Sequence, residues 1–160
     1  MKMGNPPTHP SNPTFGASSR LTDMHELAAS LCDLGPALRW MRDPTRGGLA
    51  TTLNELAGST GLAVRLQETA IPVRSEVAGA AEILGIDPLY VANEGKLVAV
   101  VSPEVADQAL GALRALPRGG DAALIGELQA DPAGLVLLDT GLGGSRIVDM
   151  LVGDPLPRIC

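Results

Sequence analysis

Short strand-like runs alternate along this chain with segments of helical spacing, and glycine or proline separates most of them. The clearest strand run is 97–101, and residues 130–134, between two later runs, have the composition of a tight turn. Doubly wound folds join parallel strands through helices, so a tight turn between strands indicates another architecture. The pattern predicts an α+β fold, a mixed β-sheet packed with helices. Helices are expected within 21–35, 48–61, 75–84 and 103–116, and strands at 37–41, 62–67, 97–101, 122–128 and 134–140.

Composition limits both the core and the partners. The chain has 160 residues, the size of one domain, and only three are aromatic, so its core must use Ala, Val, Leu and Ile. A net charge of −6 argues against a nucleic-acid partner. No apolar run reaches the roughly 18 residues that span a bilayer, and no signal peptide is recognisable. We therefore expect a cytoplasmic protein with no membrane partner.

The chain divides into three parts by composition. Residues 1–20 are rich in Pro, Asn, Ser, Thr and Gly, which is typical of a disordered tail. Residues 21–152 are expected to form the folded domain. Residues 153–160 are expected to form a flexible arm, because Pro155 and Pro157 prevent a helix there.

The first candidate site precedes the second predicted helix. Gly47 and Gly48 at a helix start leave backbone N–H groups open to an anion, which the helix dipole also favours. Thr45 could cap the helix or bind a phosphate oxygen, Arg46 could pair with phosphate, and Asp43 could hold a metal ion or cap the turn. The alternative is a plain strand-to-helix turn whose glycines permit close packing. The segment is not a Walker A loop, since the Gly-Lys-Ser/Thr ending is absent.

The second candidate is the turn of Asn93, Glu94, Gly95 and Lys96, just before the clearest strand. It places an amide, a carboxylate and an ammonium beside a strand that we expect to be buried. Desolvation there would favour the protonated form of Glu94 and suit it to act as a general base. The alternative is a solvated turn with a Glu–Lys pair.

The two cysteines differ in setting. Cys160 is the last residue of the arm, where a thiol could be carried into another site; an incidental cysteine in a frayed terminus is the alternative. Cys32 extends the apolar stripe of the first predicted helix, which Thr22 would cap, so we expect Cys32 to lie in the core. Two cysteines are too few for a four-cysteine zinc site, and no metal site is predicted.

Three segments, residues 42–57, 87–101 and 143–160, closely resemble the C-terminal half of the hydrogenase maturation factor HypE, the carbamoyl dehydratase family. The Pro-Arg-Ile-Cys ending is the most specific of these features, while residues 43–48 resemble a motif of the wider superfamily that includes aminoimidazole ribonucleotide synthetase. The resemblance covers nearly all of the chain from Leu21 onward. It implies a PurM-like C-terminal domain.

The resemblance also implies a reaction. In the family, a HypF carbamoyltransferase carbamoylates the terminal cysteine, here Cys160, and ATP with Mg²⁺ then drives its dehydration to a thiocyanate. The cyanide passes to iron on a HypC–HypD complex during assembly of the [NiFe]-hydrogenase centre. Glu94 would be the base, with Asn93 and Lys96 supporting it. The phosphate end of the nucleotide site would be shaped by Asp43, Thr45, Arg46, Gly47 and Gly48.

The chain departs from the family in length. Full-length members carry an N-terminal domain of similar size, which supplies most ATP-binding residues and the acidic metal ligands. The chain could be a truncated product, a split protein whose other half is a separate chain, or an excised domain. We expect weak or no ATP binding by the chain alone, and a non-catalytic docking module or a decayed fragment are the alternatives to a dehydratase half.

Overall fold

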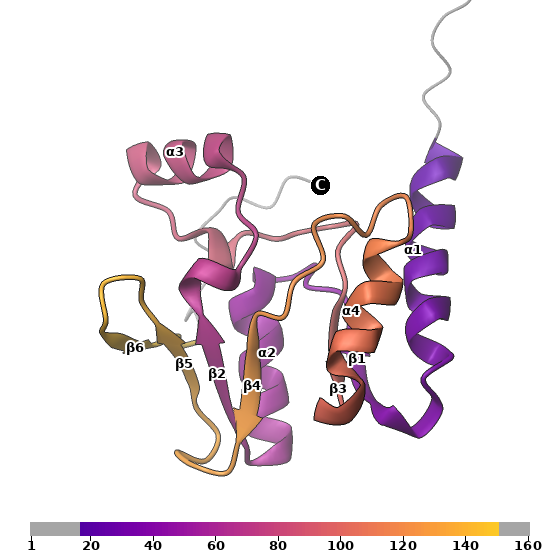
Figure 1. Ribbon diagram of the computed structural model, residues 1–160. Coiled ribbons are helices and arrows are strands. Elements are labelled where there is room, and N and C mark those ends of the chain that lie inside the picture. The colour runs from indigo at the N-terminus through magenta and orange to yellow at the C-terminus, as the bar shows by residue number, and fades with distance from the viewer. Residues whose placement is uncertain (1–16, 151–160) are drawn as a thin grey trace, which may run out of the picture.

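The structure, a computed structural model, describes residues 17–150 as helices packed with two β-sheets (Figure 1). In chain order the main elements are α1 (Ala17–Cys32), β1 (Leu38–Arg42), α2 (Gly48–Thr60), β2 (Ala63–Gln67), α3 (Ser75–Leu84), β3 (Val98–Val101), α4 (Ala106–Arg114), β4 (Gly126–Gln129), β5 (Val136–Asp139) and β6 (Ser145–Ile147). Short 3-10 helices occur between them at η1 (Gly35–Ala37), η2 (Glu68–Ala70), η3 (Pro88–Tyr90) and η4 (Pro103–Val105).

A mixed four-stranded sheet carries the fold, with strand order β4-β2-β5-β6. β2 is parallel to β5 and antiparallel to β4, and β6 is antiparallel to β5. β1 and β3 form a separate antiparallel pair. The predicted α+β fold with a mixed sheet is confirmed. The turn at 130–134 does not join neighbouring strands, however, because β2 lies between β4 and β5.

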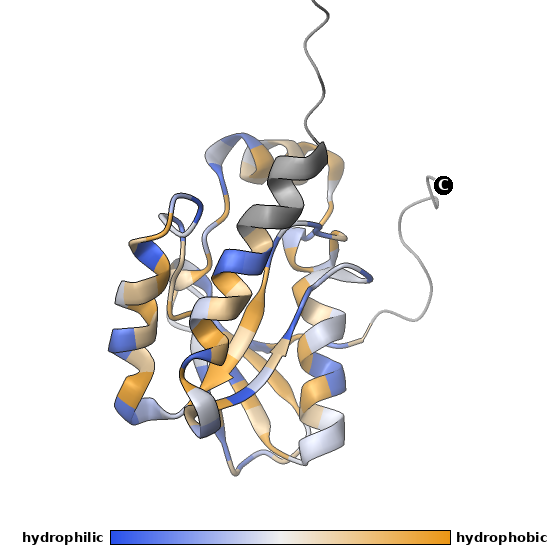
Figure 2. Ribbon diagram, turned by 90° about the vertical axis from the view of Figure 1, so that its right-hand side faces the viewer, coloured by the Kyte–Doolittle hydropathy of each residue, from blue (hydrophilic) through white to orange (hydrophobic). Residues whose placement is uncertain are grey.

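The core lies between α2 and one face of the four-stranded sheet (Figure 1). α2 contributes apolar residues at helical spacing, while β2 and β5 contribute alternate positions, as a half-buried strand should. Hydrophobic segments lie on these strands and the inner helix surfaces, and hydrophilic ones lie on loops and outer surfaces (Figure 2). The buried residues of this core are Ala50, Leu53, Leu56, Ala57, Val64, Leu66, Leu89, Val136, Leu138 and Val148.

Two helices end at glycines that the sequence indicated, whereas the first helix does not begin at its predicted cap. α2 ends at Gly61 and α3 at Gly85, both left-handed with φ of 70° and 66°, as their glycines indicated. α1 begins at Ala17, well before Thr22, so its first residues fall in the segment expected to be a tail. Residues 1–16 and the predicted arm 153–160 lie outside the described residues.

The expectation that Cys32 is buried is wrong, because Cys32 is exposed. Other residues of the predicted apolar stripe do face the protein interior: Met24 and Leu27 are half-buried, and Leu31 is 3% exposed. α1 packs mainly against α4, so only a narrow strip of its surface is covered. Cys32 lies about 100° around the helix from Leu31 and falls outside that strip.

Candidate functional site

The loop from β1 to α2 depends on its two glycines. Gly47 and Gly48 have φ of 65° and 64°, a region that side chains disfavour. A Cβ at Gly48 would lie 2.4 Å from the carbonyl oxygen of Leu89 and 2.6 Å from that of Val91, and a Cβ at Gly47 would meet Thr51. The close approach of η3 therefore requires glycine at position 48.

The first turn of α2 has the features expected of a candidate anion site. Gly47 precedes the helix and provides no side-chain cap for it. The first amides of a helix have no intrahelical acceptor, and they point along the positive end of its dipole. An anion placed beyond Gly47 would accept hydrogen bonds from them.

Beside this turn lies an open polar hollow of about 390 Å³. Arg42 forms an ion pair with Glu55, and both side chains line the hollow. The Thr45 hydroxyl donates to Asp43 Oδ2 at 3.3 Å. Guanidinium and hydroxyl groups beside free helix amides are the groups that bind phosphate. The residues that line the hollow are Arg42, Asp43, Thr45, Arg46, Thr52 and Glu55.

The structure joins the second candidate turn to this loop. The backbone N–H of Asn93 donates to the Pro44 carbonyl at 3.1 Å, so the two predicted segments lie side by side. Glu94 and Lys96 are exposed. The expected burial of Glu94 is therefore wrong, because its turn precedes β3 and no described residue covers its side chain. The turn brings a carboxylate to the loop without desolvating it.

A polar brace fixes η3 against Gly48. Asp87 Oδ1 accepts from the Leu89 N–H at 2.9 Å, and Asp87 Oδ2 pairs with Arg146 of β6 at 2.5 Å. Tyr90, next to this pair, has its pKa raised, first by burial and then by the negative charge of Asp87. The brace links β6 to the segment whose backbone lies against Gly48.

Sequence reasoning missed Thr52 and Glu55, the α2 residues of the hollow. Thr52 is 3% exposed, a buried polar residue in an otherwise apolar helix face. A signal was present, because Thr52 and Glu55 are three residues apart and follow Gly48 by one and two helical turns. Such spacing places them on the same side of α2 as the anion site.

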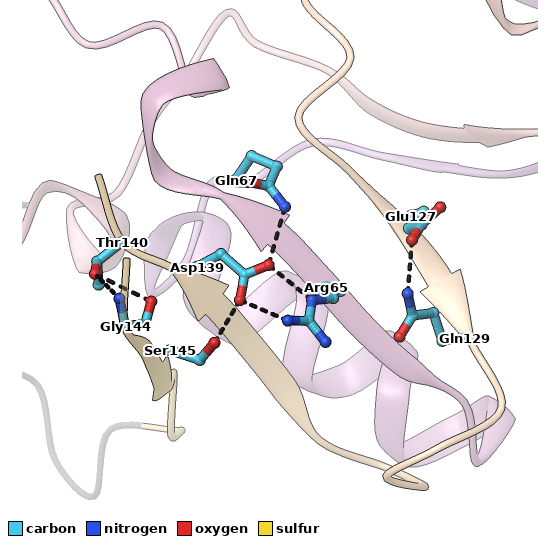
Figure 3. Close-up of polar contacts among 8 residues, drawn as sticks. All are labelled: Arg65, Gln67, Glu127, Gln129, Asp139, Thr140, Gly144 and Ser145. Atoms are coloured by element: carbon cyan, nitrogen blue, oxygen red, sulfur yellow. Dashed lines mark hydrogen bonds and ion pairs between the residues drawn. The ribbon is translucent and has the colours of Figure 1, made fainter. Parts of the chain in front are cut away.

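A second polar cluster lies across β2, β5 and β6 and was also missed. Arg65 binds Asp139 with two hydrogen bonds, of 2.7 and 2.9 Å, and Gln67 and Ser145 donate to the same carboxylate (Figure 3). The pKa of Asp139 is lowered from 3.8 to about 2. The hydrogen bond from Arg65 is the largest cause, and the one from Ser145 is the second. The same bond raises the pKa of Arg65. The cluster joins three strands and has no contact with the hollow that the structure describes.

The chain leaves β6 beside α2. Asn54 Nδ2 donates to the Val148 carbonyl at 2.8 Å and to that of Ala50, and the Val148 N–H donates to Val136. Val148 is fully buried. The segment that leads to Cys160 therefore begins from a fixed point on α2, while Cys160 itself lies outside the described residues.

Two kinds of feature are absent from the part of the chain that the structure describes. Between residues 17 and 150, no group of three or more His, Cys, Asp or Glu side chains is placed to bind a metal ion. None of the helices described there combines the length and apolar character needed to cross a bilayer.

Comparison with known proteins gives consistent matches. The family model "AIR synthase related protein, C-terminal domain" matches residues 9–138. The chain is 56% identical over 138 residues to the carbamoyl dehydratase HypE of Bradyrhizobium diazoefficiens and 53% identical over 137 residues to that of Azotobacter vinelandii. In both cases 86% of this chain and 40% of the relative are covered, so the chain spans about two fifths of these relatives.

Solved structures match in the same way. The crystal structure of the hydrogenase maturation protein HypE has a TM-score of 0.79 and 45% identity, over 86% of this chain and 44% of that one. A HypE complex with ATP has a TM-score of 0.69 and 47% identity, over 74% and 37% of the chains. A HypE–HypF complex has a TM-score of 0.74 and 42% identity, over 78% and 40%. The chain belongs to the AIR synthase related family as its C-terminal domain, and the relatives and solved structures described above are HypE proteins.

Proposed function

We propose that this chain is the thiol-carrying C-terminal part of a carbamoyl dehydratase that acts in hydrogenase maturation. The observation that carries the proposal is the hydrogen bond between Asn93 and Pro44, which joins an anion loop to a carboxylate turn. It occurs in a chain 56% identical to a carbamoyl dehydratase HypE over 86% of its length. The reaction would convert an S-carbamoyl group on Cys160 into a thiocyanate.

The residues of the loop fit the phosphate end of ATP. The free amides of α2 and the side chains of Thr45 and Arg46 would hold phosphate oxygens, and Arg42 would stay oriented by Glu55. ATP, which a solved HypE relative binds, would supply the phosphoryl group that takes the carbamoyl oxygen away as phosphate. The described residues gather no ligand set for Mg²⁺, so we assign the metal to no residue of this chain besides a single contact from Asp43.

Glu94 would take a proton from the carbamoyl nitrogen. Dehydration of –S–CO–NH₂ to –S–C≡N removes one oxygen and two protons, so a base must accept protons as the oxygen leaves. Glu94 lies in the turn held to the anion loop, with Asn93 and Lys96 beside it as supporting groups. Its exposure in this chain implies that the rest of the site must cover it to give a water-poor environment.

Cys160 would reach the site from the point where the segment before it is attached to α2. Among the described residues, the last one in the core is Val148, whose carbonyl accepts a hydrogen bond from Asn54. Asn54 lies six residues, about 9 Å, along α2 from Gly48. The ten residues after Met150 span up to about 33 Å when extended. The chain between them is therefore long enough for the thiol to visit the loop and a partner in turn.

The partners follow from the same proposal. A HypF-like carbamoyltransferase would load Cys160, in keeping with the HypE–HypF complex among the structural matches. A HypC–HypD complex would receive the cyanide, and all of these would meet in the cytoplasm. A domain equivalent to the remaining part of the relatives would complete the ATP site, either in the same polypeptide or as a separate chain.

Reconstitution tests this function. This chain is co-expressed with the part of the Bradyrhizobium relative that precedes the matched region, Cys160 is carbamoylated by a HypF-type enzyme, and ATP is added. We expect the Cys160 peptide to lose one water, as read by mass spectrometry. Cys160→Ala should abolish the product, and Cys32→Ala, the matched control, should leave it unchanged. Carbamoylation without ATP-dependent loss of water would contradict the proposal and favour a docking module.

The docking module is the second candidate, and the exposure of Glu94 favours it. An exposed carboxylate is a weak base for an amide proton, so a chain that only presents Cys160 to partners would need no more than the described residues provide. The module would bind the HypF-type enzyme equally well whether position 94 is Glu or Gln.

A further inference from the structure

Asp87 and Arg146 join two segments that the proposed reaction must bring together. Asp87 lies seven residues before Glu94, and Arg146 lies two residues before Val148, where the segment that leads to Cys160 is attached to the core. Asp87 Oδ2 and Arg146 Nη2 are 2.5 Å apart, and the two side chains are 30% and 40% exposed. One ion pair therefore connects the segment before Glu94 to the strand before the thiol segment.

Asp87 uses its two carboxylate oxygens for different contacts. Oδ1 accepts a hydrogen bond from the Leu89 N–H at 2.9 Å and so caps η3, while Oδ2 binds Arg146. A 3-10 helix of three residues has too few internal hydrogen bonds to fix its own direction, so its outside contacts set that direction. The ion pair with Arg146 therefore orients η3 and the chain that continues to Glu94.

Arg146 is presented by the edge strand β6. β6 has three residues, all exposed, and lies next to β5 at the edge of the four-stranded sheet. Arg146 is the partner of Leu138, which is 1% exposed, and paired residues of antiparallel strands point to the same face of a sheet. The guanidinium therefore leaves the sheet on the side of the core, where Asp87 meets it.

The position of η3 determines the position of the candidate site. Carbonyl oxygens of η3 and of the residue after it would lie 2.4 and 2.6 Å from a Cβ at Gly48, so the backbone of this segment lies against the start of α2. Two residues further along, the Asn93 N–H donates to the Pro44 carbonyl. A shift of η3 would therefore move the Glu94 turn relative to the loop before α2.

We propose that Asp87 and Arg146 are positioning residues for the dehydration, which hold the Glu94 turn against the loop before α2 by tying η3 to β6. The assignment rests on the proposed function, because the placement of Glu94 matters only if Glu94 acts on the group carried by Cys160. Neither Asp87 nor Arg146 lines the hollow. A partly exposed ion pair contributes little to overall stability, whereas a displacement of about 1 Å at a reacting group can slow a reaction by about 100-fold. The pair therefore acts through placement.

Tyr90 reports on this pair and is the single tyrosine of the chain. Burial is the largest cause of its raised pKa, the charge of Asp87 is the next, and Arg146 acts in the opposite direction. Absorbance titration of Tyr90 should therefore show a lower pKa in Asp87→Asn and a higher pKa in Arg146→Gln, with circular dichroism to verify that each variant folds. A titration that neither variant changes would show that the pair does not form in solution, which would refute the proposal.

Hydrogen exchange at the Asn93 N–H of this chain tests the positioning without the reaction. We expect Arg146→Gln to speed this exchange by about tenfold or more. Arg146→Lys, which keeps a charge for Asp87 but lacks the guanidinium fork, should restore most of the protection. If Arg146→Gln does not fold, Asp87→Asn, whose amide oxygen can still cap η3, is measured with the same expected result.

The matched control is Arg65→Gln, which breaks an ion pair between two other strands of the sheet (Figure 3). Arg65 does not line the hollow, and its loss should leave exchange at Asn93 unchanged. Unchanged exchange in Arg146→Gln, or equal acceleration by Arg65→Gln, would overturn the inference, since the second result would mean only a general loosening of the fold.

The reconstituted enzyme connects the pair to the reaction. Arg146→Gln should slow dehydration of the carbamoylated Cys160 by about tenfold or more, Arg146→Lys should recover most of the rate, and Arg65→Gln should leave it unchanged. Loading of Cys160 should be the same in all variants. A normal dehydration rate in Arg146→Gln would contradict the inference alone. An unchanged chain that is loaded but never dehydrates would contradict the proposed function, and exchange at Asn93 would still decide whether the pair holds the turn.

Discussion

The N–H of Asn93 donates a 3.1 Å hydrogen bond to the carbonyl of Pro44, although the two residues are far apart in sequence. This single backbone contact sets the Glu94 turn beside the loop that opens α2. Each segment alone is explained as an ordinary turn, and their contact is the observation on which the proposed shared site rests. Changes that loosen this contact should affect both segments together.

Gly48→Ala tests how tightly the loop is held. The new Cβ would lie 2.4 Å from the Leu89 carbonyl oxygen, in addition to the cost of a positive φ. We expect the free energy of unfolding to fall by about 3 kcal/mol, measured by urea denaturation. The control is Gly61→Ala, which has φ of 70° but open space around it and should cost about 1 kcal/mol. Equal losses would show that η3 moves aside freely.

Asn54→Ala tests the anchor of the segment that leads to Cys160. The change removes donors to the Val148 and Ala50 carbonyls, and Val148 is fully buried. We expect a loss of about 1–3 kcal/mol in the free energy of unfolding, and faster hydrogen exchange at Val148. Thr60→Ala removes only local bonds at the end of α2, to the Leu56 carbonyl and from the Leu62 N–H, and should change stability by less than about 0.5 kcal/mol. A protected Val148 amide in the Asn54 variant would show that β6 holds the segment unaided.

Asp139→Asn tests the cluster of Figure 3 through acid stability. The pKa of Asp139 is lowered in the fold from 3.8 to about 2, so its ionised form stabilises the native state. This contribution is complete above about pH 4, declines as pH falls, and is lost near pH 2. Thermal melting from pH 2 to 7 should show the variant less stable than the unchanged chain above pH 4, with the two curves converging near pH 2. Asp121→Asn, an exposed carboxylate, should give no such convergence.

Local features could be predicted from the sequence because they depend on near neighbours. Gly61 and Gly85 mark helix ends because glycine readily adopts the left-handed conformation found there. The apolar run at 97–101, which is rich in β-branched valine, forms β3 as its composition predicts. Gly47 and Gly48 were assigned to the helix start for the same reason. These are properties of short segments, and tertiary packing did not override them.

Long-range features could not be predicted, because they depend on which surfaces meet. Nothing in residues 130–134 indicates that β2 will lie between β4 and β5. Arg65 and Asp139 meet only because β2 and β5 are parallel neighbours in that register. The exposure of Glu94 has the same origin, since it depends on what covers the turn. A single sequence carries no record of such pairings.

The structure changes the expected result of thiol labelling, because the sequence predicted a buried Cys32 and the structure places Cys32 at the surface. Cys32 is exposed, so it should react with iodoacetamide at neutral pH in the folded chain. Labelling of Cys160 should therefore be followed in a Cys32→Ala background, with mass spectrometry to count and locate the adducts. Protection of Cys32 until the chain unfolds would show that α1 is covered by more than α4.

Glu94→Gln separates the base from its turn. In the reconstituted enzyme we expect dehydration of the carbamoylated Cys160 to slow by about 10²–10⁴-fold, because Gln keeps the size of the side chain and cannot accept a proton. Loading of Cys160 by the HypF-type enzyme should be unchanged, and so should the KM for ATP, since the phosphate-binding residues lie in the other loop.

Glu104→Gln, which removes an exposed carboxylate from η4, is the matched control and should leave the rate as it was. Because Glu94 is exposed here, the effect should require the covering domain. A near-normal rate for Glu94→Gln in the complete complex would show that Glu94 only forms the turn. The base would then have to belong to the partner.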